Sequence, residues 1–357
     1  MKRVVTITGI RPDFIRMKEV FRRLDEQFDH VMVHTGQHYD DALSRVFFED
    51  LKIRAPDHVL ATGASSRTHY EQLSYLSREI FCLFEREKLD PDVILFLGDS
   101  NSVLVSPILF KEGYTIGHIE GGMRSYDRRM PEEVNRVICD YVSDHVFVYT
   151  PVYRERLLKE NKPAEVIHVV GNTITEIVRQ YMPRGPRPKD YLVADIHRNE
   201  NLASPAQYRY ILTFLERLGE ALDLPVKLVR FSRAVRMIEA HGLLEGLRRV
   251  ELVGPYGFRR YLELQYGARA VVSDSGTCQE ECPLLGVPAI VPRNCTERPE
   301  SMENGNSILV GETRPIEDMV RESLQFLRGY RVSEEKLQWL GDGRTAERIV
   351  NILKERI

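Results

Sequence analysis

The stretch VVTITGIRPDFIRMKEVFRRL, residues 4–24, changes from one structural pattern to another within a few positions. Its first part, residues 4–9, is a continuous β-branched run typical of a strand that is buried on both faces. After a short turn, apolar side chains return at helical spacing and share one face of a predicted helix. These are Phe14, Met17, Val20, Phe21 and Leu24. A strand that leads directly into an amphipathic helix is the repeating unit of α/β proteins.

The same alternation continues to the end of the chain. Short β-branched runs recur, and most of them end in Gly, Asp, Ser or His. After the first run they occupy residues 31–36, 93–98, 115–120, 146–150, 166–171, 191–197, 226–231, 250–254, 270–274, 289–292 and 307–310. Helical patterns lie between them, as at Tyr210, Phe214, Leu218 and Leu222. So many strands exceed what one compact sheet usually holds, so we predict an α/β fold with two doubly wound, Rossmann-like units.

The boundary between the two units is predicted at residues 179–189, which are rich in proline and basic side chains like a linker. We therefore expect an N-terminal α/β domain over residues 1–178 and a second domain over residues 190–341. Residues 342–357 carry apolar side chains at roughly helical spacing. This periodicity leaves open whether that helix ends the second domain or crosses back to the first.

The composition is that of an ordinary globular protein. Of the 357 residues, 43% are hydrophobic and 29% charged, and the formal net charge is -3. This balance gives no reason to expect nucleic acid or an anionic membrane as a partner. The five cysteines are too few for a disulfide framework. The first residues match a signal peptide poorly, because their apolar run is short and interrupted. No stretch approaches the ~18 apolar residues of a membrane span. We expect a cytoplasmic protein.

Candidate groups for proton transfer follow several predicted strands. In doubly wound sheets, ligands bind outside the carboxyl ends of the strands, and Asp99, Glu120, Glu132 and His197 fall at or near such positions. Carboxylates that are desolvated in a cleft acquire pKa values far enough apart to act as acid and base. For any single Asp or Glu, a helix cap or a surface salt bridge is the commoner role.

A candidate phosphate site lies at Ser275, Gly276 and Thr277, where the chain is predicted to enter a helix. Backbone N–H groups and the helix dipole favour a phosphate there, and the two hydroxyl groups add donors. Glu280 or Glu281 is placed to accept from a ribose hydroxyl pair. The alternative is an ordinary capping motif, which needs no ligand.

Two arginines, Arg11 and Arg298, are candidate diphosphate clamps because guanidinium geometry fits phosphate oxygens; the alternative for each is a structural ion pair. The fingerprints GxGxxG and GxxxxGK[ST] are absent from the sequence. Cys278 and Cys282 are spaced four apart, but no matching second pair completes a metal site, so core packing is favoured and no metal is expected.

These motifs occur in an order that resembles the UDP-N-acetylglucosamine 2-epimerase family of the non-hydrolysing type. The resemblance covers nearly the whole chain. It is carried by Gly9-Ile10-Arg11-Pro12-Asp13, Thr35-Gly36-Gln37-His38, Gly98-Asp99-Ser100, His118-Ile119-Glu120-Gly121-Gly122-Met123-Arg124-Ser125, Pro131-Glu132-Glu133-Val134-Asn135-Arg136, Gly171-Asn172-Thr173, His197-Arg198-Asn199-Glu200-Asn201, the segment 273–281 and Thr296-Glu297-Arg298-Pro299-Glu300.

The resemblance implies a glycosyltransferase-B-type fold, with two domains facing across a cleft and the C-terminal helix crossing back to the first. It implies interconversion of UDP-GlcNAc and UDP-ManNAc by elimination and re-addition of UDP, with no cofactor and no metal. The residues it assigns fall into two groups. Asp99, Glu120, Glu132 and His197 would be catalytic. The substrate and its UDP group would be bound by Arg11, Arg16, Ser275, Gly276, Thr277, Glu281 and Arg298. The resemblance also implies a homodimer.

The sequence departs from the family pattern at several of these positions. Arg16 replaces the usual Lys, Asp13 the usual Glu, and Thr277 the second Gly of the phosphate loop, where a Cβ is expected to restrict a backbone with positive φ. The pair Gln37-His38 resembles part of a second nucleotide-sugar site, although the residues after it depart from that pattern. The short loop between Glu120 and Glu132 also occurs in relatives that act on diacetamido uronic acids or 6-deoxy sugars. A hydrolysing epimerase and a glycosyltransferase of the same fold are more distant alternatives.

Overall fold

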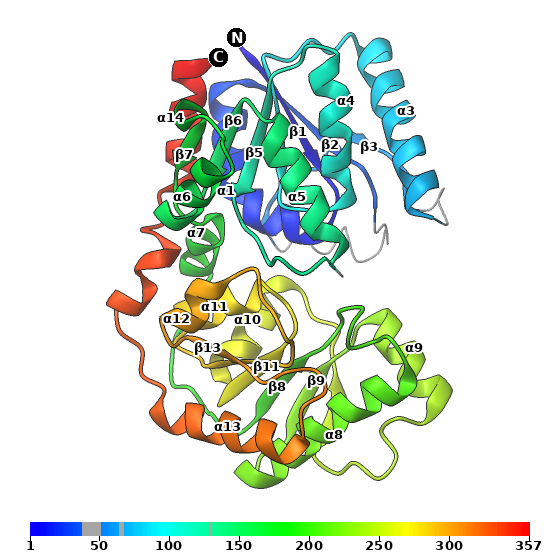
Figure 1. Cartoon of the computed structure of the whole chain (residues 1–357), viewed down its shortest axis with the longest axis vertical. Helices are drawn as coiled ribbons and strands as arrows, with labels where there is room; N and C mark the ends of the chain where they lie inside the picture. The colour runs from blue at the N-terminus through cyan, green and yellow to red at the C-terminus, as the bar shows by residue number, and fades with distance from the viewer. Residues whose placement is uncertain (38–50, 64–67, 129) are drawn as a thin grey trace. The chain divides into compact units, whose positions relative to one another are not determined.

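The computed structural model describes residues 1–37, 51–63, 68–128 and 130–357; the side chain of Arg11 lies outside what it describes. These residues form two compact units: Met1–Ile177 with Trp339–Ile357 (unit 1), and Val178–Gln338 (unit 2). Each unit holds one parallel sheet with helices packed on it (Figure 1). Within the described ranges, no helix is both long and apolar enough to cross a membrane.

The sheet of unit 1 has the strand order β3-β2-β1-β4-β5-β6-β7, and every pair in it is parallel. Its strands are β1 (Arg3–Thr8), β2 (Asp29–His34), β3 (His58–Val59), β4 (Val93–Leu97), β5 (Ile116–Gly121), β6 (His145–Val148) and β7 (Ile167–Val169). The order reverses direction between β1 and β4, the place where doubly wound sheets open a crevice at their carboxyl ends.

The helices of unit 1 cover both faces of this sheet. They are α1 (Arg11–Gln27), α3 (His69–Glu87), α4 (Ser106–Lys111), α5 (Pro131–Val142), α6 (Pro151–Lys159), α7 (Thr173–Gln180, which continues into unit 2) and α14 (Thr345–Arg356). Apolar residues of α3, α4 and α5 share one core with the strands. The C-terminal helix α14 packs against α1, the first helix of the chain (Figure 1).

Unit 2 repeats the design with the order β10-β9-β8-β11-β12-β13, again parallel throughout. Its strands are β8 (Leu192–Asp195), β9 (Val226–Val229), β10 (Val250–Val253), β11 (Ala270–Ser273), β12 (Ala289–Val291) and β13 (Ser307–Leu309). Its helices are α8 (Pro205–Leu222), α9 (Ser232–His241), α10 (Phe258–Gly267), α11 (Cys278–Leu284), α12 (Pro299–Glu303) and α13 (Ile316–Gly329). Here the order reverses between β8 and β11.

Local sequence signals explain why the elements begin where they do. Helix α1 carries Pro12 in its first turn, and the Asp13 carboxylate accepts hydrogen bonds from the N–H groups of Gly9 (2.7 Å) and Ile10 (3.0 Å). Helix α8 follows Ser204, whose hydroxyl accepts from the Gln207 N–H. Capping oxygens of this kind satisfy N–H groups that have no partner within the helix.

The predicted α/β class with two doubly wound sheets is confirmed. The strand β3 was not predicted, because two residues at a sheet edge carry no periodicity to recognise. The run predicted as a strand over residues 191–197 also ends early, at Asp195. Because Ile196 and His197 leave the ladder, the His197 N–H is available to a side chain instead, and it donates to Asp274 (3.0 Å).

Candidate active site

In unit 1, two predicted acids lie at the carboxyl ends of neighbouring strands. Asp99 follows β4, and Glu120 lies near the end of β5. A Cβ added to Gly98, which separates β4 from Asp99, would lie 3.8 Å from a carboxylate oxygen of Glu120. The Glu120 carboxylate therefore lies against the turn that carries Asp99, so the fold gathers both acids beside the switch point of the sheet.

Glu120 has an unusual backbone conformation, with φ at 79°. The register between β5 and β6 shifts between Ile119 and Gly121, so Glu120 lies at a bulge. A non-glycine residue in a sparsely populated region costs about 1–3 kcal/mol, and such residues cluster where side-chain direction matters. The bulge re-aims the Glu120 side chain away from the alternation of an ordinary strand.

The Glu120 carboxylate is buried and held by two side chains. Arg16 of α1 approaches it at 2.6 Å, and the Tyr149 hydroxyl donates to it at 3.3 Å. The same hydroxyl lies 2.9 Å from that of Thr173, and the Arg16 guanidinium lies 5.7 Å from the centre of the Tyr149 ring. Arg16, which the sequence analysis noted as a departure from the usual Lys, thus neutralises the buried Glu120.

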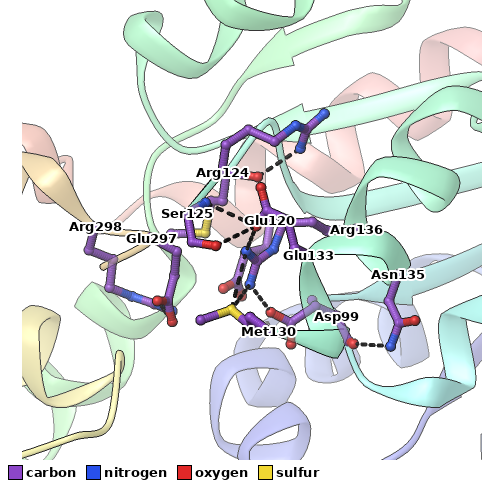
Figure 2. Close-up of polar contacts among 12 residues, drawn as sticks. Asp99, Glu120, Arg124, Ser125, Met130, Glu133, Asn135, Arg136, Glu297 and Arg298 are labelled. Atoms are coloured by element: carbon purple, nitrogen blue, oxygen red, sulfur yellow. Dashed lines mark hydrogen bonds and ion pairs between the residues drawn. The ribbon is translucent and has the colours of Figure 1, made fainter. Parts of the chain in front are cut away.

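Asp99 forms an ion pair with Arg136 of α5, and Figure 2 shows the guanidinium between Asp99 and Glu133. The Asp99 backbone carbonyl accepts from the Asn135 side chain at 2.8 Å. Glu132 on this helix was predicted to be a catalytic acid. It is half-buried, and its neighbour Glu133 joins the network with Arg136. The pair could have been predicted from the sequence, because the three-residue spacing of Glu133 and Arg136 places both side chains on one helix face.

Glu133 acts as an anchor for the loop before α5. Its carboxylate accepts from the N–H and the hydroxyl of Ser125 (2.9 and 2.8 Å) and from the N–H of Tyr126 (3.0 Å). Burial raises the pKa of Glu133, but these donors and Arg136 outweigh burial and hold it below the ordinary value. Glu133 is therefore an anionic structural group.

A buried histidine, His118, ties the two strand ends together. One ring nitrogen bonds to Asp140 and the other to the Gly98 carbonyl, both at 2.7 Å. Asp140 also accepts from Arg124 (2.7 Å) and the Gly122 N–H (3.0 Å). Burial lowers the pKa of His118, but the groups around it, Asp140 among them, raise it well above its usual value. A ring with an acceptor at each nitrogen is a cation.

Asp13 is a third carboxyl group near this edge of the sheet. It is buried, and burial raises its pKa to about 7 despite the two N–H groups it accepts from; the charges of Asp99 and Glu120 raise it further. The neighbouring Arg11 was predicted to clamp a diphosphate, but its side chain lies outside the described residues.

In unit 2, His197 follows β8 with its Nδ1 at 2.8 Å from Asp195. The second oxygen of Asp195 accepts from the Tyr261 hydroxyl at 2.7 Å. Asp274 accepts from the N–H groups of His197 and Arg198. The ligand atoms of Asp195, His197 and Asp274 lie within 4.8 Å of one another. All four carboxylate oxygens already accept hydrogen bonds, so this cluster orients the imidazole rather than offering free ligands to a metal.

The charge of His197 depends on this arrangement. Burial lowers its pKa, but the Asp195 carboxylate outweighs burial and raises the pKa above its ordinary value. An Nδ1–H that donates to Asp195 leaves Nε2 as the atom available to a ligand.

We predict that Asp195→Asn lowers the pKa of His197, because the amide removes the negative charge that stabilises the imidazolium. Titration of the His197 ring protons by NMR measures this value. Tyr261→Phe is the matched control, since it removes a hydrogen bond to Asp195 but keeps the charge, and we expect a smaller shift from it. An unchanged pKa in Asp195→Asn contradicts the assignment.

The predicted phosphate loop of unit 2 enters α11 as expected, but one expectation about it is wrong. Thr277 has φ at -61° and ψ at -33°, in the ordinary right-handed helical region, so its Cβ restricts nothing. A Cβ on Gly276 would lie 2.1 Å from the Arg298 guanidinium and 2.5 Å from a Glu297 carboxylate oxygen, so the ends of these two side chains would have to shift. Ser275 lies beside it and is half-buried.

Arg298 and Glu281 are both buried in unit 2. Arg298 pairs with Glu280 (3.0 Å) and Glu297 (2.7 Å). These contacts agree with the alternative given above for Arg298, a structural ion pair. Glu281 accepts from the Gln265 amide at 3.0 Å. In the second candidate site, Gln37 is half-buried after β2, whereas His38 lies outside the described residues.

Two doubly wound parallel sheets with acidic, basic and hydroxyl side chains at the carboxyl ends of their strands define an α/β protein of the glycosyltransferase-B type. A family model described as UDP-N-acetylglucosamine 2-epimerase matches residues 22–354. The chain therefore belongs to the UDP-N-acetylglucosamine 2-epimerase family.

Individual relatives span the whole chain. A UDP-N-acetylglucosamine 2-epimerase of Methanocaldococcus jannaschii is 33% identical, with 97% of each chain covered. A UDP-2,3-diacetamido-2,3-dideoxy-D-glucuronate 2-epimerase of Pseudomonas aeruginosa is 32% identical, with 98% of this chain and 99% of that protein covered. The crystal structure of the M. jannaschii enzyme in complex with UDP-GlcNAc and UDP superposes with a TM-score of 0.89 at 31% identity over 99% of each chain.

Proposed function

We propose that this chain interconverts UDP-GlcNAc and UDP-ManNAc. In the forward step the C2 proton is removed as the C1–O bond to UDP breaks, which leaves a C1=C2 double bond in a 2-acetamidoglucal. UDP then adds back to C1 while a proton reaches C2 from the other face. The observation that carries the proposal is that Asp99 and Glu120 lie at the ends of adjacent strands. Arg136 pairs with Asp99, and Arg16 pairs with Glu120.

This chemistry explains why acids are needed here. The C2–H bond is weakly acidic and breaks only as cationic character grows at C1, which nearby carboxylates stabilise. Two faces of C2 must be served, and so two proton-transfer groups are needed. We assign these roles to Asp99 and Glu120, with Glu132 as a third candidate acid. His197 would donate from Nε2 to the leaving diphosphate.

We assign UDP binding to unit 2, the C-terminal domain predicted over residues 190–341. The backbone of Ser275, Gly276 and Thr277 and the guanidinium of Arg298 would contact the diphosphate, and Glu281 the ribose. Buried hydrogen-bond donors near an anion support such a role. In unit 1, Arg11 and Arg16 would add positive charge. No step of this reaction calls for a nicotinamide or a metal ion.

A second candidate substrate is the UDP-linked diacetamido uronic acid. The relative of that name is 32% identical to this chain, against 33% for the UDP-GlcNAc enzyme, and this difference is too small to choose between the sugars. Both reactions break and form the same bonds at C1 and C2.

The test is incubation of the protein with UDP-GlcNAc in D₂O, followed by proton and phosphorus NMR. Deuterium at C2 together with UDP-ManNAc supports the proposal. Free UDP with reducing ManNAc would instead identify a hydrolysing epimerase. Absence of exchange in protein that binds UDP would overturn UDP-GlcNAc as substrate, and the same assay with the diacetamido uronic acid then tests the second candidate.

Replacement of Asp99 by Asn is expected to lower the epimerisation rate by about 10²–10⁴-fold, because an amide neither accepts nor returns a proton. The affinity for UDP, measured by calorimetry, is expected to stay within about twofold of the wild type. Asn101→Ala is the matched control, because it removes a neighbouring polar side chain that contacts Asn135. Turnover of Asp99→Asn at the wild-type rate would remove Asp99 from the mechanism.

We also propose that the protein is a cytoplasmic homodimer that supplies a polysaccharide or glycoconjugate pathway. Its five free cysteines fit a reducing compartment. On α5, Val134, Val137 and Tyr141 are 56%, 41% and 81% exposed, and their spacing places them on one helix face. An exposed apolar face of this kind suits a second copy of the chain. Light scattering of wild type and Val134→Glu tests this, with a monomer expected for the variant.

A further inference from the structure

A strongly basic pocket lies in unit 2, away from the carboxyl ends of its strands. It has a volume of about 520 Å³ and is lined by five cationic residues, Arg187, Lys189, Arg269, Arg328 and Arg331. The remaining lining residues carry no charge. Arg269 directly precedes β11, and Arg328 belongs to the last turn of α13 (Figure 1). The pocket therefore opens at the amino ends of the strands, opposite the edge that carries His197 and the predicted phosphate loop.

Arg187 forms the fixed wall of this pocket. Its guanidinium donates to the carbonyls of Tyr266 (2.7 Å), Gly286 (2.8 Å) and Ala268 (3.2 Å), and it lies 5.4 Å from the centre of the Tyr266 ring. Burial lowers the pKa of Arg187, and the charge of Arg269 lowers it further.

The C-termini of nearby helices offset part of the positive charge of this pocket but not all of it. Helices α10, α11 and α13 all end near the pocket. The C-terminus of a helix is equivalent to about half a negative charge. Three such ends therefore offset fewer than two of the five cations. Over residues 1–37, 51–63, 68–128 and 130–357, Lys189, Arg269, Arg328 and Arg331 form no ion pair with a carboxylate.

Uncompensated charge in a concave site selects for an anion. Five cations held within one pocket repel one another, and a bound anion relieves this repulsion. The volume falls in the range of small-molecule sites. The whole chain carries a net charge of -3, which disfavours a long polyanion as the ligand. Pro288, Leu327 and Tyr330 add an apolar wall, which suits a ligand with an organic part.

We propose that this pocket binds a small multivalent anion, a diphosphate group either free or as part of a nucleoside diphosphate. The site is separate from the proposed active site and does not depend on the function proposed above. Lys189 and Arg331 contact the solvent-facing side of the anion, and Arg269 contacts its inner side.

The experiment is a calorimetric titration of the full chain with inorganic pyrophosphate and, separately, with ADP. Both are repeated on Ser275→Glu, in which an added carboxylate repels anions from the predicted phosphate loop and leaves the pocket unchanged. The variant is Lys189→Gln/Arg328→Gln, in which two exposed cations of the pocket are neutralised. The matched control is Arg217→Gln/Arg260→Gln, which neutralises two exposed arginines on α8 and α10 of the same unit. Thermal unfolding verifies that both proteins fold.

We expect pyrophosphate or ADP to bind Ser275→Glu as tightly as wild type, and the pocket variant to bind at least tenfold more weakly, since a charge-assisted contact is worth about one order of magnitude. The control is expected to stay within twofold. Tighter binding of ADP than of pyrophosphate identifies a nucleoside diphosphate, and the reverse order a free diphosphate. Equal loss in the pocket variant and its matched control, loss of binding in Ser275→Glu, or no binding at millimolar concentration overturns the proposal. Heparin that binds more tightly than either probe and displaces both would also overturn it, in favour of an extended polyanion.

Discussion

Glu120→Gln is expected to reduce kcat/KM for epimerisation by about 10²–10⁴-fold, the usual contribution of a positioned acid or base. The amide keeps the size of the side chain but neither accepts a proton nor neutralises Arg16. The loss is expected in the chemical step, because Glu120 lies in unit 1 whereas the phosphate loop, Arg298 and Glu281, which are assigned to UDP, belong to unit 2. Initial rates by NMR and UDP affinity by calorimetry measure the two effects separately.

Two further variants make this result interpretable. Glu120→Asp keeps the charge but withdraws the carboxylate, so it separates loss of catalysis from loss of the buried ion pair with Arg16. Glu19→Gln is the matched control, because Glu19 lies on α1 three residues after Arg16 but pairs with Lys18 and Arg22. If Glu120→Gln turned over as fast as Glu19→Gln, Glu120 would have no catalytic role.

The two acids are also expected to differ from each other. If each acts on one face of C2, Glu120→Gln and Asp99→Asn impair elimination from opposite epimers. Deuterium exchange measured separately from UDP-GlcNAc and UDP-ManNAc detects this asymmetry. Equal losses from both epimers in both variants would mean that the acids act together rather than one on each face.

Asp140→Asn is expected to destabilise the protein by about 3–5 kcal/mol, the usual cost of breaking a buried charge pair. Asp140 is 2% exposed and joins His118, Arg124 and the Gly122 N–H. The amide cannot satisfy two cations, so His118 would lose its carboxylate partner, and Arg124 would keep only Glu160 (2.6 Å). Urea unfolding of the two proteins measures the difference.

The pH dependence of this difference has a definite sign. Burial raises the pKa of Asp140, but His118 and Arg124 outweigh burial and hold it below its usual value. Its contribution is therefore present above about pH 4 and is lost as pH falls through the folded-state pKa. The pKa of His118 is raised, so its contribution is complete below about pH 6.5 and is lost as pH rises through its folded value.

We therefore expect the difference between wild type and Asp140→Asn to be largest between about pH 4 and pH 6.5 and to shrink in stronger acid. The matched control is Asp342→Asn, which removes an exposed pair with Arg348 and should cost less than about 1 kcal/mol. A difference that did not vary with pH would indicate that the loss comes from packing rather than from charge.

The sequence was most informative where chemistry depends on residue type. Asp99 and Glu120 were selected because they follow predicted strands, and the structure places both at the carboxyl ends of β4 and β5. His118 and Arg136 received no role, because each acts through a partner that lies 16 or more residues away: Asp140 and Gly98 for His118, and Asp99 for Arg136. Contacts of this kind carry no local periodicity.

In the predicted phosphate loop, the sequence suggested a backbone constraint that the structure does not have. Thr277 was expected to suffer from a positive φ that the structure does not have, because the residue has already entered the helical region. A Cβ on the preceding Gly276 would require the ends of the Arg298 and Glu297 side chains to shift. The sequence predicted a loop that enters α11, but it assigned to Thr277 a backbone conformation that this residue does not have.

By itself, the sequence determined the α/β class, the doubly wound pattern and the family, because these depend on periodicity and on the order of motifs. Only the tertiary structure decided the left-handed backbone of Glu120, its pairing with Arg16 and the cationic state of His118. The same holds for the basic pocket around Arg187, whose cations come from three separate segments. The physical reason is shared: burial and long-range pairing set charge and direction, and neither is encoded in the spacing of neighbouring residues.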